Sequence, residues 1–315
     1  MSVGQTNEEL QISERGQITT RFNAAITNLG STSLDVRLGG IYALQRIMQD
    51  SVQDQRPVVS VLSAFVRQHA SVAISGSTPT EEYTLPTDVA AAVSVLANRP
   101  GDREVTPDGK PLYRVDLSSV DLRGLEREVG LTEAGTPRRS NFRFANFTGA
   151  DLRTAGLENY DLSGASLDNA NLRGVQLPNA NLRHAFLGNA DLSYAHMGAT
   201  DMTGADLGGA NLHHARLSRA AETNEAGGAD SSADLTRAYL LRANLSAADL
   251  RGVTLIGANL TDADLADADL RGADLTRADL SNADLTGARL SGARLSGAIL
   301  EGARGVSLHG RSGSP

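Results

Sequence analysis

The segment GANLTDADLADADLRGADLTRADL, residues 257–280, places a leucine at every fifth position and an alanine two residues before each leucine. A five-residue step turns an α-helix by about 140°, which would spread these leucines around the whole helix and leave no apolar stripe. A flat strand also fails, because its side chains alternate and would point Leu265 and Leu270 to opposite faces. Neither regular secondary structure fits this segment.

A coil that turns a corner after each repeat keeps every leucine inside. Four corners close a square of about twenty residues, and successive squares stack about 4.8 Å apart. Alanine and leucine columns then fill the interior, while the other positions face water. We therefore expect a β-solenoid of about eight coils, about 38 Å tall, with a core of roughly thirty Leu-sized side chains. The repeat centres run from Phe142 to Leu217 and from Leu235 to Leu300, with two earlier ones at Leu117 and Leu122.

The repeats resemble those of a known family. Segments such as ADLADADLRGADL and ANLRHAFLGNADL match the A(D/N)LXX pattern of the pentapeptide-repeat proteins over residues 112–305. The resemblance implies a mainly β fold, the right-handed quadrilateral β-helix. The earlier stretch LDVRLGGIYAL is similar to the N-terminal segment of some actinobacterial members, which implies a helical domain before the solenoid.

Residues 1–110 lack the five-residue repeat and show helical spacing instead. We predict a small bundle of four helices in this part. They cover 8–29, 33–50, a segment with Asp54 as its N-cap and Pro57 in its first turn, and a segment capped by Thr87. The predicted domains are an α-helical domain 1–110, a pentapeptide-repeat β-helix 111–305 with insertions at 123–140 and 220–232, and a flexible tail 306–315.

The two ends of a solenoid need cover, because exposed edges invite strand addition. We expect the helical domain to cap the first coil. The tail GVSLHGRSGSP is too short and polar to form a capping helix, so the last coil is either an open edge or a contact between two copies. The resemblance to topoisomerase-binding members of the family implies a homodimer through the C-terminal coil.

Composition limits the classes of function. There is no cysteine, and hence neither a disulfide framework nor a cysteine metal site. No secretory segment follows Met1, and no apolar run approaches the ~18 residues of a membrane span. We therefore expect a cytoplasmic protein without a membrane partner. The net charge of -8 argues against direct nucleic-acid binding through a basic patch.

No chemistry-bearing motif is found. His184, His196 and His214 fall on different predicted faces and do not converge on one ion. The chain has no nucleophile elbow and no P-loop, and a solenoid filled with leucine and alanine has no interior cavity for a substrate. We therefore predict that the protein is not an enzyme and has no catalytic, cofactor-binding or metal site.

An acidic segment is the main candidate for a partner surface. Between Asn259 and Asp284 the aspartates outnumber the arginines, and residues twenty apart stack on one face, as Asp264 does near Asp284. Rows of carboxylates on such a rod could imitate DNA phosphates. Family members that protect type II topoisomerases are described as DNA mimics of this kind. The resemblance implies a protein partner such as DNA gyrase or topoisomerase IV and tolerance to gyrase poisons. The candidate residues are Asp262, Asp264, Asp267, Asp269, Asp274, Asp279 and Asp284.

The two insertions are further candidates, because loops on a rigid scaffold are common functional sites. Quinolone-resistance members of the family use such loops against gyrase. The acidic residues involved are Glu126 and Glu128 in the first insertion and Glu222, Glu225 and Asp230 in the second.

Structural alternatives remain for each candidate. The insertions could be tolerated surface loops. The aspartates could serve turn amides on a solvated face, and residues 234–304 carry 10 acidic against 8 basic side chains, a weak imbalance for a DNA mimic. An alternative function is a rigid scaffold or adaptor, in which the helical domain recruits a partner and the solenoid acts as a spacer.

Overall fold

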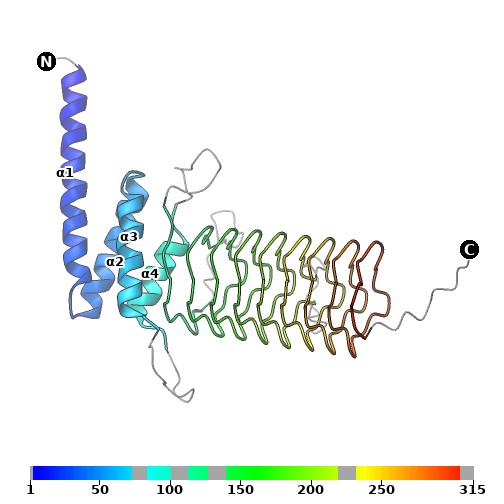
Figure 1. Ribbon diagram of the computed structural model, residues 1–315. Coiled ribbons are helices and arrows are strands. Elements are labelled where there is room, and N and C mark those ends of the chain that lie inside the picture. Colours follow the sequence, from blue (N-terminus) through cyan, green and yellow to red (C-terminus); the bar gives the residue numbers. More distant parts are fainter. Residues whose placement is uncertain (1–2, 73–83, 101–112, 127–139, 219–231, 306–315) are drawn as a thin grey trace, which may run out of the picture. The chain divides into compact units, whose positions relative to one another are not determined.

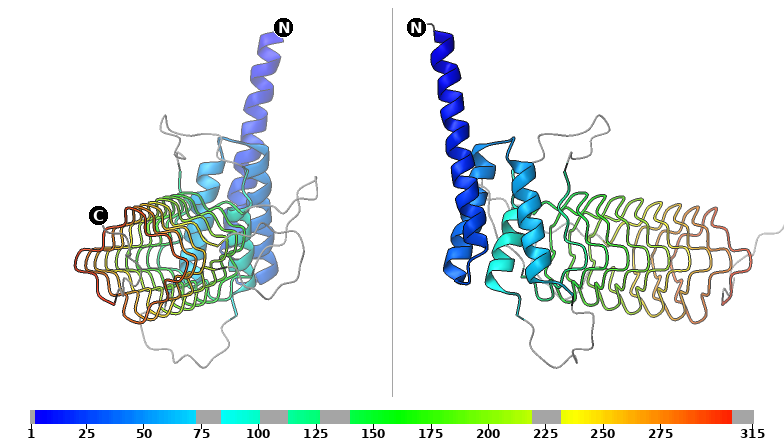
Figure 2. Two further views of the ribbon diagram at one scale, coloured as in Figure 1. Left: turned by 90° about the vertical axis from the view of Figure 1, so that its right-hand side faces the viewer. Right: turned by 60° about the vertical axis from the view of Figure 1, so that its left-hand side comes forward.

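The computed structural model describes residues 3–72, 84–100, 113–126, 140–218 and 232–305 (Figure 1). These residues fall into two compact units. The first lies within Met1–Ser71 and Leu85–Leu117, and the second within Val72–Thr84 and Ser118–Pro315. All of the described helices belong to the first unit, and the second unit is a solenoid (Figure 2).

The four helices predicted in the N-terminal part are confirmed. They are α1 (Val3–Leu29), α2 (Leu34–Asp50), α3 (Gln55–His69) and α4 (Thr87–Ala97). Helix α1 begins at Val3 and not at Glu8. The apolar residues expected to form the inner face of α2 are buried, namely Ile41, Leu44, Ile47 and Met48. None of the described helices is both long and apolar enough to cross a membrane.

The predicted caps are only partly right. Asp54 does precede α3, but its side chain makes no capping hydrogen bond. Thr87 is not a cap, because α4 begins with Thr87 itself and Pro86 stands at the cap position. At the N-terminus of α4 a backbone N–H is bonded by Asp88, whose Oδ1 accepts the Val89 N–H at 3.0 Å.

Two contacts explain how the helices of this unit are held together. The Arg37 Nε of α2 donates to the buried Asp88 Oδ2 of α4 at 2.6 Å. At Gly40 a Cβ would lie 2.9 Å from the Ala25 carbonyl oxygen of α1, so α1 and α2 approach too closely for a side chain there. The glycine at Gly40 is therefore explained by close packing, whereas a Cβ at Gly39 would meet nothing within 4 Å.

The solenoid has the predicted four-sided coil. In one coil the outward residues Thr254, Asn259, Asp264 and Asp269 define face 1, face 2, face 3 and face 4, in that order. Each forms a parallel bridge with the residue 20 positions later, as Asp264 does with Asp284. The bridges are isolated, so no longer strand occurs in the described coils. A five-residue step with a corner leaves too short an extended segment for one.

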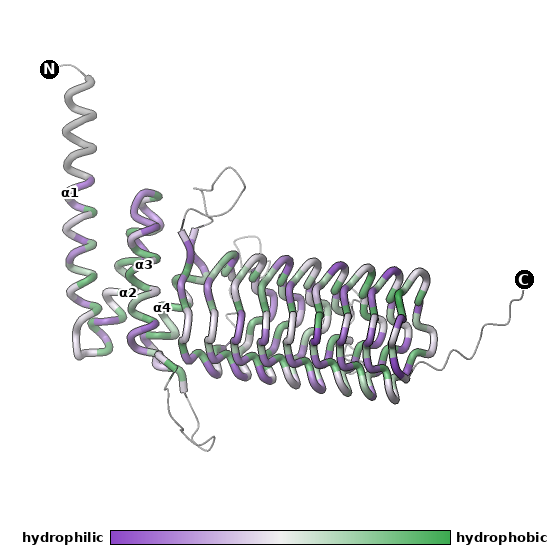
Figure 3. The backbone as a smooth tube through the Cα atoms, viewed as in Figure 1, coloured by the Kyte–Doolittle hydropathy of each residue, from purple (hydrophilic) through white to green (hydrophobic). Residues whose placement is uncertain are grey.

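The interior of each coil holds the predicted alanine and leucine columns. Ala263 and Leu265 are 1% and 0% exposed, and the alternation of apolar and polar positions along the coils is visible in Figure 3. Backbone bonds join neighbouring coils: the Leu265 N–H donates to the Asp284 carbonyl at 2.7 Å, and the Asp264 N–H to the Ala243 carbonyl at 3.0 Å. The coils are thus stabilised by apolar burial together with a continuous hydrogen-bond ladder.

Both insertions leave the solenoid at the same corner. The carbonyls of Leu125 and Ser140 accept the N–H groups of Gly156 on face 4 and Asp161 on face 1. The first insertion therefore falls between face 4 and face 1. The second falls between the same faces, after Arg216 on face 4 and before Asp234 on face 1.

The 20-residue gap between the repeat centres Leu122 and Phe142 predicts that the first insertion replaces three repeats, and this prediction is wrong, whereas the 13 residues of the second insertion are confirmed. Asp201 bridges Asp234, as expected for 13 residues added to one coil of 20. Asp121, however, bridges Asp151 and not Asn141. The stretch from Leu122 to Phe142 therefore does not replace a whole coil, because the chain completes face 4 before it leaves.

The last coil is uncovered by any described residue. Leu290, Leu295 and Leu300 are partly exposed, whereas the leucines one coil earlier, Leu270, Leu275 and Leu280, are fully buried. The apolar cross-section of the solenoid is thus open at this end among the described residues.

Candidate interaction surface

The seven aspartates of the acidic segment do not share one surface. Asp269, Asp274 and Asp279 lie on face 4, face 1 and face 2, respectively. Only Asp264 and Asp284 lie on face 3, with Asp262 and Asp267 at the corners before and after Asp264. Each five-residue step turns the chain onto the next face, so the seven aspartates form rows on different faces, with Asp264 and Asp284 in one row as predicted.

The outward aspartates stabilise the turns, which confirms the structural alternative. In each case Oδ1 accepts the backbone N–H two residues later, at 2.9 Å from Ala266 to Asp264 and at 3.0 Å from Ser281 to Asp279. The aspartate thus satisfies a corner amide that the coil leaves without a backbone partner. Hydroxyl donors reinforce three of these contacts, from Thr276, Ser281 and Thr286.

Arginines offset much of the negative charge. On face 4 the Arg271 Nη2 lies 2.6 Å from the Asp269 Oδ2, and Arg251 lies 2.7 Å from Asp249. Two further pairs join successive coils, Arg294 to Asp274 at 3.5 Å and Arg304 to Asp284 at 3.0 Å. Faces 1 and 4 are therefore mixed-charge surfaces and not rows of free carboxylates.

These contacts also set the pKa values of the carboxyls. The hydrogen bond from Arg271 holds the pKa of Asp269 below its usual value. The hydroxyls of Thr276, Ser281 and Thr286 do the same for the pKa values of Asp274, Asp279 and Asp284. All four carboxylates are consequently charged at neutral pH and already engaged within the protein.

The remaining acidity concentrates on face 3. We call Asp262, Asp264 and Asp267 the acidic face; Asp284 is left out of it, because its carboxylate is paired with Arg304. Among the described residues, the one ion pair of Asp262 is a long contact of 3.6 Å to the exposed Arg242. Asp264 and Asp267 have no ion pair among the described residues, and both are exposed or nearly so. This set is the part of the predicted surface that could meet a cationic partner.

One of the five loop candidates lies among the residues that the structure describes. Glu126 is exposed and follows Leu125, the last residue of its coil before the first insertion. The other acidic residues predicted in the insertions lie outside the described residues, namely Glu128, Glu222, Glu225 and Asp230.

The histidines do not form a metal site in the described parts of the chain, where no group of three suitable side chains comes together. His184 follows Asn181 on face 1, and His214 follows Asn211 on the opposite face 3. His213 and His214 pack against each other and against Tyr194 with tilted rings, whose centroids are 4.1 Å apart for His213–His214 and 5.2 Å apart for Tyr194–His214.

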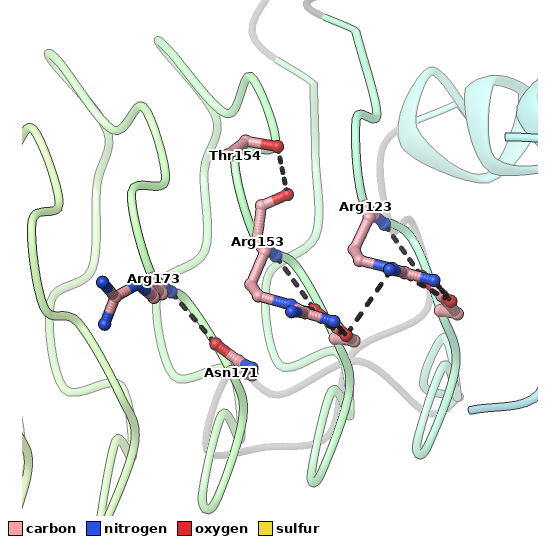
Figure 4. A network of polar contacts seen from close by, with 7 residues as sticks. Arg123, Arg153, Thr154, Asn171 and Arg173 are labelled. Carbon is pink, nitrogen blue, oxygen red and sulfur yellow. Dashed lines mark hydrogen bonds and ion pairs between the residues drawn. The ribbon is translucent and has the colours of Figure 1, made fainter. Parts of the chain in front are cut away.

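An arginine ladder on face 3 was not predicted from the sequence. Arg123 pairs with Asp121 at 2.7 Å and also lies 3.7 Å from Asp151 of the next coil, and Arg153 pairs with Asp151 at 2.6 Å (Figure 4). The signal for it is the tripeptide Asp-Leu-Arg, which occurs at 121–123, 151–153, 249–251 and 269–271. The aspartate and the arginine of this tripeptide lie on the same side of the coil, so the carboxylate pairs with the guanidinium two residues later.

Comparison with known proteins adds a family match. A family model described as pentapeptide repeats matches in 8 copies, over residues 157–193, 187–220, 231–266 and 263–302. No curated protein matches the chain.

Several solved structures are similar to the chain. Rfr23, a pentapeptide repeat protein from the cyanobacterium Cyanothece 51142, is 30% identical, with 39% of this chain and 86% of that chain covered and a TM-score of 0.28. HetL from Nostoc sp. strain PCC 7120, involved in heterocyst differentiation regulation, is 29% identical, with 58% and 88% covered and a TM-score of 0.24. QnrB1, a plasmid-mediated fluoroquinolone resistance protein, is 20% identical, with 58% and 90% covered and a TM-score of 0.36.

Proposed function

Because the protein belongs to the pentapeptide-repeat family, we propose that its solenoid is a non-catalytic surface for recognition of a partner protein. The more specific proposal is that the partner is a bacterial type II topoisomerase, DNA gyrase or topoisomerase IV. The acidic face, Asp262, Asp264 and Asp267, takes the place of DNA phosphates, and binding protects the enzyme from gyrase poisons.

One observation carries this proposal: face 3 presents carboxylates that the protein itself does not neutralise. Asp264 and Asp267 have no ion pair among the described residues, whereas Asp269 and Asp274 each contact an arginine. A topoisomerase surface that binds DNA is basic, and unpaired carboxylates are attracted to it over about 10 Å at 0.1 M salt. The solenoid interior is filled by leucine and alanine, so recognition belongs to the outer faces.

The test compares two triple variants that change the net charge equally. Asp262→Asn, Asp264→Asn and Asp267→Asn neutralise the acidic face. Asp269→Asn, Asp274→Asn and Asp279→Asn neutralise the other three faces and serve as the control. Asparagine keeps the side-chain oxygen that caps each turn and tolerates a positive φ, so neither triple should unfold the rod.

Binding to immobilised gyrase is then measured for both triples. The first triple is expected to weaken binding about tenfold or more, if each carboxylate contributes about 0.5 kcal/mol, and the control is expected to change it little. Equal affinities for the unchanged protein and the first triple would contradict the acidic-face proposal. Equal losses in both triples would show that only net charge matters.

We also propose that two copies associate through the last coil. The partly exposed Leu290, Leu295 and Leu300 form an apolar surface that a second copy would cover. The pairing would join the open ends of two solenoids and remove their free edges.

The alternative is a rigid scaffold whose helical unit recruits the partner. The charge pairing on face 4 favours this scaffold function. There the carboxylates of Asp249 and Asp269 are neutralised by Arg251 and Arg271, and such a surface does not select a partner by its charge. A chain carrying the acidic-face triple would then retain its partner in full.

A further inference from the structure

Face 2 carries three exposed side chains in consecutive coils: Phe186, Asp206 and Tyr239. The two aromatic rings are 49% and 57% exposed, and Asp206 between them is also exposed. The outward residues before and after this group, Ser166 and Asn259, are both partly buried. Large aromatic rings are unfavourable in water, so two exposed rings on either side of a carboxylate are typical of an interaction site.

The backbone holds these three residues in line. Phe186 forms a parallel bridge with Asp206, and Asp206 forms one with Tyr239. The Asp206 N–H donates to the Ala185 carbonyl at 2.9 Å, and the Tyr239 N–H donates to the Ala205 carbonyl at 2.9 Å. Adjacent strands are about 4.8 Å apart, so the two aromatic residues stand about 9.6 Å apart with the aspartate midway.

The Asp206 carboxylate lacks the donors that its counterparts have. At most other aspartates the residue two positions later is a threonine, serine or arginine whose side chain donates to the same carboxylate. This holds at Asp151, Asp201, Asp249, Asp269, Asp274, Asp279 and Asp284. After Asp206 that position is Gly208, which supplies only its backbone N–H, at 3.0 Å from Oδ1. Among the described residues Asp206 has no other hydrogen bond and no ion pair.

We propose that Phe186, Asp206 and Tyr239 form a docking site for an arginine side chain of a partner protein. A cation bound to Asp206 would lie one coil spacing, about 4.8 Å, from the coil of Phe186 and from the coil of Tyr239. This is within the roughly 6 Å over which a cation and an aromatic ring attract each other. The exposed Leu241, two residues after Tyr239, would contact the aliphatic stem of the arginine.

Arginine fits this site better than lysine. Its guanidinium is flat, stacks on aromatic rings and is less strongly hydrated than an ammonium group, and its N–H groups can bind the free Asp206 oxygen while the faces meet the rings. The solenoid already contains the same kind of contact, with the Arg173 guanidinium carbon 4.5 Å from the centroid of the Tyr194 ring.

The site lies on a different face from the acidic face. It rests on the proposed role of the solenoid in protein recognition, and it does not depend on a topoisomerase partner. A failed gyrase experiment would leave it standing, and its own test uses no topoisomerase.

The test is a titration of the full-length ¹⁵N-labelled protein with the peptide acetyl-Gly-Arg-Gly-amide, followed by the backbone amide signals. Matched peptides carry citrulline, which has the same shape without the charge, or lysine. The arginine peptide is expected to shift the signals of Gly208 and Tyr239 saturably, with a Kd of about 1 mM, and to leave Ala266 unchanged. The citrulline peptide should produce no saturable shift, and the lysine peptide should bind more weakly.

Variants separate the contributions. Asp206→Asn keeps the oxygen that accepts the Gly208 N–H and should raise the Kd about tenfold. Asp234→Asn is the matched control, because among the described residues the Asp234 carboxylate is also bonded only to a backbone N–H, that of Thr236 at 2.9 Å, but its bridge partners are Asp201 and Thr254, not aromatic residues. Phe186→Ala and Tyr239→Ala should each raise the Kd about threefold.

Three results would overturn the proposal. They are equal binding of the citrulline peptide, equal shifts at Ala266 and Gly208, and an unchanged Kd in Asp206→Asn. Lysine binding as tight as arginine binding would overturn the assignment of a guanidinium.

Discussion

Asp264 forms a parallel bridge with Asp284, yet the two carboxylates have different partners. Asp284 accepts hydrogen bonds from the Thr286 hydroxyl at 2.6 Å and from Arg304 at 3.0 Å. Asp264 accepts only the Ala266 N–H among the described contacts. Two side chains that are equivalent in the repeat therefore differ in their contacts: Asp284 is engaged within the solenoid, whereas Asp264 keeps a carboxylate oxygen without a described partner.

The lowered pKa values predict how stability depends on pH. A carboxyl whose pKa is lower in the folded state stabilises the fold above its unfolded pKa of about 3.9, and this stability is lost as the pH falls through the folded pKa. Asp269, Asp274, Asp279 and Asp284 all have lowered pKa values. The midpoint of urea unfolding should change little between pH 7 and about pH 5 and fall below about pH 4. A midpoint that rises below pH 4 would contradict this.

A single hydroxyl should control one of these pKa values. The Thr276 hydroxyl is the main cause of the lowered pKa of Asp274. Thr276→Val keeps the shape of the side chain and removes the hydroxyl, so the pKa of Asp274 should rise towards its usual value of about 3.9. Carboxyl-carbon NMR during a pH titration measures it. Asp269, whose donor is Arg271, provides the internal control and should not change.

The leucine column should dominate the stability of the solenoid. Leu260 is 0% exposed, and Leu260→Ala should lower the free energy of unfolding by about 2–5 kcal/mol. Leu241 is 42% exposed, and Leu241→Ala should change it by less than about 0.5 kcal/mol. Urea denaturation of both variants checks the difference. Similar losses in the two would mean that the interior is not the main source of stability.

The corner conformation should be measurable at Gly272. Its φ is +70°, and a Cβ there would meet nothing within 4 Å, so any cost of substitution comes from the backbone. Gly272→Val should destabilise the solenoid by about 1–2 kcal/mol, whereas Gly272→Asn should cost less, because asparagine tolerates this region. Thermal unfolding compares them, and equal costs would argue against a positive φ at this corner.

The open last coil predicts self-association. Sedimentation of the full-length protein should show a dimer, and Leu295→Glu should shift it to the monomer by placing a charge in the apolar contact. Leu241→Glu, on the side of the solenoid, is the control and should remain dimeric. A monomer at all concentrations before any substitution would contradict the dimer.

Much of the fold follows from the sequence because the period of five is incompatible with a helix and with a flat strand. The positions of Ala263 and Leu265 inside the coil, the helices α1 to α4 and the 13-residue second insertion were all predictable from spacing. The register of Asp121 was not, since the sequence around the first insertion does not reveal that the chain completes face 4 before leaving the coil.

The candidate surface was less predictable than the fold. The sequence predicts rows of residues twenty apart, and the structure places Asp264, Asp269, Asp274 and Asp279 on four different faces in agreement with it, but the sequence does not show which carboxylates are neutralised. The partner of each carboxylate depends on residues two positions later or one coil away, as with Arg271 and Arg304. Such relationships appear only once the coil is closed.

The most direct test of the proposed function is a gyrase supercoiling assay with increasing amounts of the protein. It is run with and without a gyrase poison, at two salt concentrations. If the topoisomerase proposal holds, we expect inhibition or protection at micromolar protein that weakens at higher salt and is lost in the acidic-face triple variant, because the attraction of exposed carboxylates is screened by salt. No effect at large excess would contradict the topoisomerase proposal and leave the solenoid as a scaffold.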